Sequence, residues 1–129
     1  MNGDYILNKL KEKGSPLRPS QDKISLPIID RMCKKMKHGV KFKPIDVCSD
    51  HWIIDGHHRY ISSILSSYDI EAVTDYPKPH VLNEIDWADV EFVEDDWDTP
   101  AKVKMLNGLD AEHNGMEIED IEDILNEKA

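Results

Sequence analysis

The sequence predicts a small α+β domain followed by an acidic helical extension. Its 129 residues suit one compact domain, and a hydrophobic content of 40% provides the material for one core. Up to about residue 80, segments with apolar residues at helical spacing occur among short apolar runs typical of strands. We therefore expect an N-terminal helix or tail over residues 1–14, a folded domain over 15–93 and the acidic extension over 94–129.

Two helices are expected before the first strand. Residues 1–13 form a short helix or a frayed terminus. A longer helix is expected over 22–39, where apolar residues recur at helical spacing. Ser25 is placed as its N-cap, with a hydroxyl that accepts from the first turn, and Pro27 suits that turn because its missing N–H costs nothing there. Gly39 then closes the helix.

The following segment predicts two strands, a helix and a third strand. Residues 43–55 alternate and then become fully apolar, with a turn at Ser49-Asp50 between the two strands. A helix with an apolar inner face follows over 57–68. A further strand is expected over 70–77, where two prolines end it.

The acidic extension gives weaker signals. Residues 87–93 alternate and are typical of an edge strand. A helix is expected over 101–109, with Gly108 near its end. Residues 114–129 predict an amphipathic acidic helix, which is either packed on the domain or, over 115–128, bound to a protein partner.

The charge is divided unevenly along the chain. Residues 1–66 carry 12 Lys/Arg and 7 Asp/Glu, a net charge of +5, whereas residues 67–129 carry 4 Lys/Arg and 19 Asp/Glu, a net charge of −15. The basic half suits an anionic ligand, and the acidic half would repel a long polyanion. A small phosphate compound therefore fits better than a nucleic acid, although acidic tails also serve simply to keep proteins soluble.

Targeting and redox signals are sparse. No stretch approaches the ~18 consecutive apolar residues of a membrane span, and no signal-peptide pattern follows Met1. Cys33 and Cys48 form no C-x-x-C motif, and we expect both to be reduced thiols. These observations predict a cytoplasmic protein without membrane contact.

The stretch "IIDGHHRY" gathers polar groups at the start of a helix. The first N–H groups of a helix have no internal acceptor, and with the helix dipole they attract anions. Gly56 lets a phosphate approach the backbone, and Arg59 offers a planar fork of donors. His57 and His58 can each donate a hydrogen bond. Asp55 would hold a divalent cation carried by a polyphosphate or orient a neighbouring side chain, so the turn predicts a Mg-nucleotide site.

The same turn is compatible with simpler roles. Asp55 could cap the helix and pair with Arg59 without any ligand. A zinc site would need His57 and His58 on one metal, but neighbours on a helix point about 100° apart. The remaining histidines show no i, i+4 pairing, and neither cysteine has the sequence context of an activated thiolate.

The order of motifs around the turn resembles that of the ParB/sulfiredoxin-like superfamily. "LRPSQDKI" (17–24) comes first, then a helix ending at Gly39, then "KPIDV" (43–47) and "WIIDGHHRYISSI" (52–64). The similarity covers about residues 15–80. It implies a small domain with a mixed sheet flanked by helices, and a phosphate site where the Gly-x-His-Arg helix begins.

Branches of this superfamily attach different chemistry to the turn. Sulfiredoxins have Gly-Gly-Cys-His-Arg, and His57 stands here in place of the attacking Cys. That resemblance implies phosphate binding by Gly56, His58 and Arg59, with help from the Ser20 hydroxyl, but no sulfinic acid reduction. ParB proteins proper bind CTP with a Gly-Glu-Arg-Arg turn and carry a DNA-binding helix-turn-helix, whereas this acidic chain shows no basic recognition helix.

ADP-dependent free serine kinases and related ParB-like proteins have the same Asp-Gly-His-His-Arg turn. This resemblance implies that Asp55 assists the metal and the transferred phosphate, while His57, His58 and Arg59 hold phosphates. The general base in that group is a glutamate of the first loop. Here the loop has Gln21, which cannot act as a base, and the adjacent Asp22 is the candidate instead.

Three functional hypotheses are consistent with these residues. The first is a small phosphotransferase that uses Mg²⁺ with ATP or ADP, with Asp55, His57 and Asp22 as catalytic residues. The second is a non-catalytic nucleotide-binding regulator that acts on a protein partner through the helix over 115–128. The third is a ParB-like nuclease or DNA-processing accessory of a phage or mobile element, against which the acidic second half of the chain argues.

Overall fold

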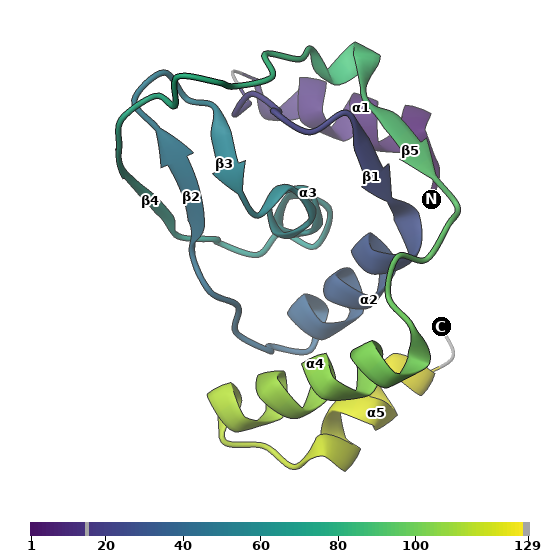
Figure 1. The fold of residues 1–129 in the computed structure, drawn as a ribbon. Helices are drawn as coiled ribbons and strands as arrows, with labels where there is room; N and C mark the ends of the chain where they lie inside the picture. Colours follow the sequence, from purple (N-terminus) through teal and green to yellow (C-terminus); the bar gives the residue numbers. More distant parts are fainter. Residues whose placement is uncertain (15, 128–129) are drawn as a thin grey trace.

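The computed structural model describes residues 1–14 and 16–127 and has a mixed α+β fold, which confirms the predicted class (Figure 1). Residue 15, where the domain was expected to begin, and residues 128–129 of the predicted last helix lie outside the described residues. None of the described helices is long and apolar enough to cross a membrane. In chain order the elements are α1 (Gly3–Lys13), β1 (Lys23–Ser25), α2 (Leu26–Lys37), β2 (Ile45–Cys48), β3 (Ile53–Asp55), α3 (His57–Leu65), β4 (Ala72–Tyr76), the 3-10 helix η1 (Trp87–Asp89), β5 (Glu91–Val93), α4 (Pro100–Asn114) and α5 (Ile118–Asn126).

The described strands form two small sheets. One has the order β3-β2-β4, with β2 and β3 antiparallel around the predicted turn at Ser49-Asp50 and β4 parallel to β2. The second is a parallel pair of β1 and β5, in which Ile24 is the partner of Phe92. The two sheets lie on either side of α3 (Figure 1). They therefore bring segments that are distant in sequence to the first turn of this helix.

The segment predicted as a helix over residues 22–39 is helical from Leu26, directly after Ser25, which occupies the predicted N-cap position. Residues 23–25 form β1 instead, because Ile24 is fully buried and its backbone pairs with β5 at the far end of the chain. Pro27 lies in the first turn as predicted, but Ser25 makes no side-chain cap, and its Oγ donates to the carbonyl oxygen of Asp95 at 2.7 Å. The strand predicted over 87–93 likewise starts as η1 and becomes β5 only at its end.

Helix α3 packs at the centre of the main core. It contacts α1 and α2, and its predicted inner-face residues Tyr60 and Ile61 are buried. Ile45 of β2 and Ile53 of β3 are fully buried in the same cluster, which also includes Ile6 of α1. Burial of these apolar side chains supplies the main favourable free energy and holds the start of α3 against the ends of both strands.

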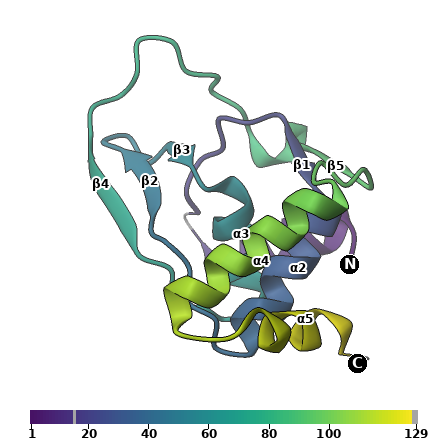
Figure 2. The same ribbon diagram turned by 60° about the horizontal axis from the view of Figure 1, so that its bottom comes forward.

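The acidic extension packs on the domain instead of projecting from it. Helix α4 continues through Gly108, where we expected its end, and stops at Gly115, whose φ of 63° suits a residue without a side chain. Figures 1 and 2 both place α4 next to α2, with α5 beside it. Ile121 of α5 is fully buried with Val40 and Ala111 in a second, smaller cluster. The apolar stripe of α5 is thus packed within the chain.

Candidate functional site

The turn between β3 and α3 depends on a glycine for two separate reasons. Gly56 has a φ of 102°, which side chains disfavour. A Cβ at this position would also lie 2.6 Å from Ile45 Cγ2 and 2.9 Å from Arg59 Nη2. Gly56, and not Asp55, occupies the N-cap position of α3, and no side chain caps the helix. The alternative in which Asp55 caps the helix is therefore wrong. The first backbone bond of α3 runs from Tyr60 N to Gly56 O at 2.9 Å, which leaves the preceding N–H groups without an acceptor inside the helix.

His57 is a buried acceptor that fixes the first loop. His57 is only 4% exposed, and its Nε2 accepts a hydrogen bond from the backbone N–H of Ser20 at 2.9 Å. The Ser20 hydroxyl donates to the carbonyl oxygen of Ile53 at 2.5 Å. Burial, and secondarily the neighbouring His58, lowers the pKa of His57 to about 4. The ring is therefore neutral near pH 7, with its proton on Nδ1 and its accepting nitrogen directed at the loop.

His58 fixes β1 in the same way, as a hydrogen-bond acceptor. Its Nε2 accepts the backbone N–H of Ser25 at 3.0 Å, and its ring meets the Trp97 ring edge-on with 5.3 Å between centroids. Burial lowers the pKa of His58 to about 4, against the opposing effect of the Asp98 charge. Neither histidine offers a positive charge near pH 7. Together they fasten the first loop and β1 to α3.

Arg59 is the positively charged side chain of this turn. Its Nη2 lies 3.3 Å from Asp55 Oδ2 and also donates to Pro44 O at 3.3 Å, so the predicted pairing of Arg59 with Asp55 is confirmed. The Arg59 side chain is only 17% exposed, and its buried Nε has no hydrogen-bond partner among the described residues. The Asp55 side chain, in contrast, is 70% exposed. The guanidinium is thus held in place but not fully satisfied.

A groove connects Arg59 to helices α2 and α4. This cavity of about 420 Å³, called here the α2–α4 groove, is lined by residues of α2, of the segment 41–43 and of α4, with Arg59 from α3. Apolar side chains form part of its wall, and basic ones gather around them. The apolar members are Ile28, Met32, Phe42, Leu106 and Leu109, and the basic ones are Arg31, Lys35, Lys41, Lys43 and Arg59.

Besides Arg59, which pairs with Asp55, two of the groove's cations are neutralised from within the chain. Lys35 Nζ lies 2.7 Å from Asp110 Oδ2, and Arg31 is bound by carboxylates of the segment before α4. Lys41 and Lys43 make no ion pair with any described residue. The groove therefore keeps uncompensated positive charge beside the first turn of α3, in a chain whose net charge is −10.

The two carboxylates proposed for catalysis, Asp55 and Asp22, lie in different places. Asp46 is the partner of Asp55 in the β2–β3 ladder, so these two carboxyl groups lie across from one another. Asp22 is exposed, its carbonyl oxygen accepts from Glu91 N at 2.8 Å, and no described contact joins it to the turn. Across residues 1–14 and 16–127, no three His, Cys, Asp or Glu side chains form a metal-binding group.

Sequence reasoning identified the turn but missed the groove. The spacing of Lys41 and Lys43 around the partly buried Phe42 was a usable signal, because alternation places both lysines on one side. Asp46 also alternates with buried neighbours in "PIDV". Nothing local marked Arg31, since its partners lie at least 65 residues away.

No family model, curated protein or solved structure matches this chain. A function for the chain therefore has to be inferred from the geometry of the turn and the groove.

Proposed function

We propose that this protein binds the phosphates of ATP or ADP in the α2–α4 groove, at its junction with the β3–α3 turn. The observation that carries the proposal is the position of Arg59. Its guanidinium belongs to the first turn of α3, where unbonded N–H groups and the helix dipole attract anions, and it also lines the groove. One arginine therefore joins a phosphate-binding helix start to a cavity that can take the rest of a nucleotide.

Charge and shape support the same ligand class. Lys41 and Lys43 add positive charge at the groove, and phosphate oxygens pair well with such side chains. The apolar wall suits a flat, weakly polar group such as a nucleobase, because ligand pockets combine apolar walls with a few placed polar groups. A cavity of about 420 Å³ lies within the ordinary range for small-molecule sites.

The residues of the predicted turn divide into two roles under this proposal. Arg59 and the backbone N–H groups after Gly56 contact phosphate. His57, His58 and Ser20 act as positioning residues, because their polar atoms are already engaged in fixing the first loop and β1.

A magnesium ion would enter with the nucleotide. The exposed Asp55 carboxylate, with Asp46 across the ladder, fits this role, since Mg²⁺ is commonly held by one or two carboxylates plus substrate phosphates. When bound, the ion would neutralise charge on the phosphates.

The activity we propose on this basis is that of a small phosphotransferase. Phosphoryl transfer depends mainly on positioning and charge neutralisation, which Arg59, the groove lysines and Asp55 would provide. A non-catalytic nucleotide-dependent regulator is the second candidate. It is favoured by the fact that α4, which lines the groove, also packs on α5, so a bound ligand would contact the C-terminal helices directly.

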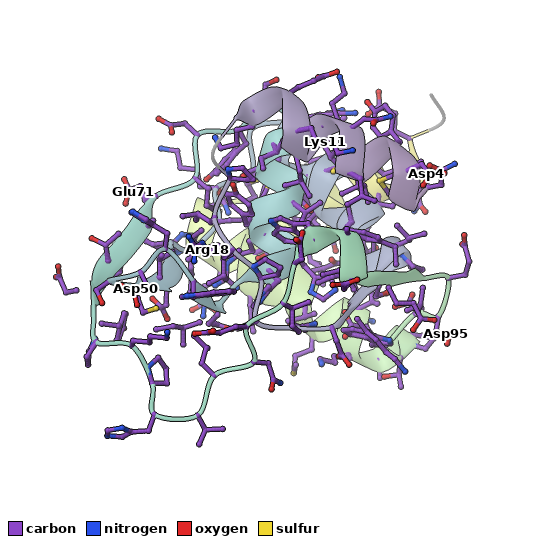
Figure 3. All side chains as sticks on the ribbon, turned by 90° about the horizontal axis from the view of Figure 1, so that it is seen from above. Asp4, Lys11, Arg18, Asp50, Glu71 and Asp95 are labelled. Atoms are coloured by element: carbon purple, nitrogen blue, oxygen red, sulfur yellow. The ribbon has the colours of Figure 1, made fainter. Side chains whose placement is uncertain are left out.

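The test is calorimetric titration of the full chain with ADP and ATP, each with Mg²⁺. We expect Arg59→Met, which keeps a long apolar stem, to weaken binding about tenfold or more, because charge-assisted bonds to phosphate are lost. Lys11→Met is the matched control, since Lys11 is an exposed cation on α1 that does not line the groove (Figure 3). Equal affinity of the unmodified chain and Arg59→Met would overturn the proposal. So would the absence of binding both by the unmodified chain and by Asp96→Asn, a variant in which the groove's Arg31 loses a carboxylate partner.

A further inference from the structure

Residues 94–98, called here the acidic segment, connect β5 to α4 and lie against the groove. Figure 3 labels Asp95 on this connection. Asp96 binds Arg31 through both carboxylate oxygens, at 2.6 Å and 2.9 Å. Asp98 Oδ2 lies 3.3 Å from the same guanidinium, and its side chain is only 8% exposed. The acidic segment thus places two carboxylates on one cation of the groove.

The remaining contacts of the acidic segment reach the first turn of α3 and its neighbour β1. The Asp95 carbonyl oxygen accepts from Ser25 Oγ at 2.7 Å, and the Trp97 ring packs edge-on against His58. Four consecutive residues of the segment therefore each contact the basic half of the molecule. These contacts reach α2, which lines the groove, and the start of α3, where the phosphates bind under the proposed function.

The geometry at Arg31 is that of an occupied anion site. The Arg31 guanidinium donates two parallel hydrogen bonds to one carboxylate, and it would present the same pair of donors to a phosphate. Asp98, which lines the groove itself, adds a second negative charge to this place. If both carboxylates were neutralised, Arg31 would be available to an anionic ligand in the groove.

We propose that the acidic segment is an internal competitor of the anionic ligand, and that Arg31 is a further ligand-binding residue, which becomes available when phosphate exchanges with Asp96 and Asp98. This inference rests on the proposed function. Exchange would also release Trp97 from His58 and free the segment that leads into α4, whose first turn is capped by Thr99 and joined to Asp98 through Lys102. Ligand binding would then make the acidic segment between β5 and α4 more mobile.

The acid dissociation of Asp96 agrees with this arrangement. The hydrogen bond from Arg31 lowers the pKa of Asp96 to about 2, so the carboxylate is charged at every pH at which a nucleotide would be bound. The competition is therefore one of two anions for a single guanidinium, and the charge of Asp96 does not vary with pH near neutrality.

The test compares variants of one segment. Asp96→Asn removes the bidentate partner of Arg31, and we expect about fivefold tighter binding of Mg-ADP by the full chain. Asp95→Asn is the matched control, because it removes the same charge from the adjacent residue while only the backbone of Asp95 makes the recorded contact. We expect its affinity to stay within about twofold of the unmodified chain. In an Arg31→Met background, the gain from Asp96→Asn should fall to the level of the control.

A second measurement needs no variant. Saturating Mg-ADP should speed amide hydrogen exchange in residues 94–98 of the unmodified chain, because the segment is released. If Asp96→Asn binds no better than Asp95→Asn and exchange in the segment is not accelerated, the segment is a fixed clamp and the inference is wrong. In that case the Arg59→Met comparison still decides the proposed function. Absence of binding by both the unmodified chain and Asp96→Asn overturns both.

Discussion

The β3–α3 turn and the α2–α4 groove meet at Arg59, yet they use their polar side chains in opposite ways. In the turn, His57 and His58 each accept a backbone N–H from an earlier segment and are neutral near pH 7. In the groove, Lys41 and Lys43 make no ion pair within the described part of the chain. The polar groups of the turn hold its own fold together, and the groove keeps charge free for a ligand.

This difference separates two properties that one sequence motif combines. A cluster of His, Arg and Asp at a helix start indicates an unusual backbone conformation. Here the two histidines hold that conformation by accepting backbone N–H groups of the first loop and β1. Binding capacity depends on groups that the fold leaves unsatisfied, such as the Arg59 Nε and the groove lysines. We therefore expect substitutions in the turn to act on stability, and substitutions in the groove to act on binding.

Lowering the pH should destabilise the protein through the two histidines of the turn. Folding lowers the pKa of His57 and of His58 from 6.5 to about 4, so between these values the unfolded chain binds more protons than the folded one. Stability is therefore highest above pH 6.5 and falls as the pH drops toward 4. The combined loss should be several kcal/mol, since one pKa unit corresponds to about 1.4 kcal/mol. Urea unfolding between about pH 7 and pH 4.5 measures it.

The histidine origin of this loss can be checked directly. His57→Gln and His58→Gln keep an acceptor near the Nε2 position but cannot be protonated, so the double variant should show a much flatter dependence of unfolding free energy on pH. His80→Gln, a change in an exposed loop residue, should leave most of the dependence in place. An unchanged slope in the double variant would show that the rings are not responsible.

A comparison of two glycines tests the close packing of the turn. Gly56 and Gly39 both have positive φ, at 102° and 83°. A Cβ on Gly39 would meet nothing within 4 Å, whereas a Cβ on Gly56 would overlap Ile45. We expect Gly39→Ala to cost about 1 kcal/mol of unfolding free energy and Gly56→Ala about 3 kcal/mol, measured by urea unfolding. Equal costs would mean that the turn relaxes around a side chain and that Gly56 is needed only for its backbone angle.

The sequence located the turn because its residues are contiguous, but it did not determine their roles. Asp55, Gly56 and Arg59 could be assigned to one helix start from their order alone. Whether His57 donates or accepts depends on the N–H of Ser20, which is 37 residues away, and no local pattern encodes that contact. The ion pairs of the groove were beyond sequence reasoning for the same reason, since Lys35 and Asp110 are 75 residues apart.

The errors in the predicted elements also come from distant contacts. The segment expected to contain the second helix was begun at residue 22, although its helically spaced residues start at Ile28, and residues 23–25 pair with β5 instead. The helix over 101–109 was expected to end just after Gly108, and glycine lowers helix propensity by about 1 kcal/mol. Packing of α4 on α5 outweighs that cost, and Ile118 Cδ1 of α5 lies 3.9 Å from the Cβ position of Gly108. Strong local signals, such as the turn between β2 and β3, were predicted correctly.

Asp55 tests whether the turn has any catalytic role beyond structure. Under the proposed phosphotransferase activity, Asp55→Asn should lower turnover about a hundredfold or more, because the carboxylate that assists the metal and the transferred phosphate is lost. Binding should remain within about threefold, since Arg59 and the lysines are unchanged. Calorimetry and a nucleotide-turnover assay on the same preparation separate the two effects. Loss of binding together with turnover would indicate that Asp55 acts mainly by holding Arg59.

Two asparagines of α4 provide the smallest and most closely matched comparison. Asn107 is 4% exposed, and its Oδ1 has no hydrogen-bond partner among the described residues. Asn114 binds Lys41 N and O and also Asp110 O, at 2.7, 3.1 and 2.8 Å. Asn107→Leu should therefore raise the unfolding free energy by about 1 kcal/mol, because a buried unsatisfied acceptor is replaced by an apolar group of similar size. Asn114→Leu should lower it by a similar or larger amount, because it leaves the backbone groups of Lys41 unpaired beside the groove. If both variants change the unfolding free energy in the same direction, as measured by urea unfolding, hydrogen bonding by these two asparagines does not determine how strongly α4 packs on the domain.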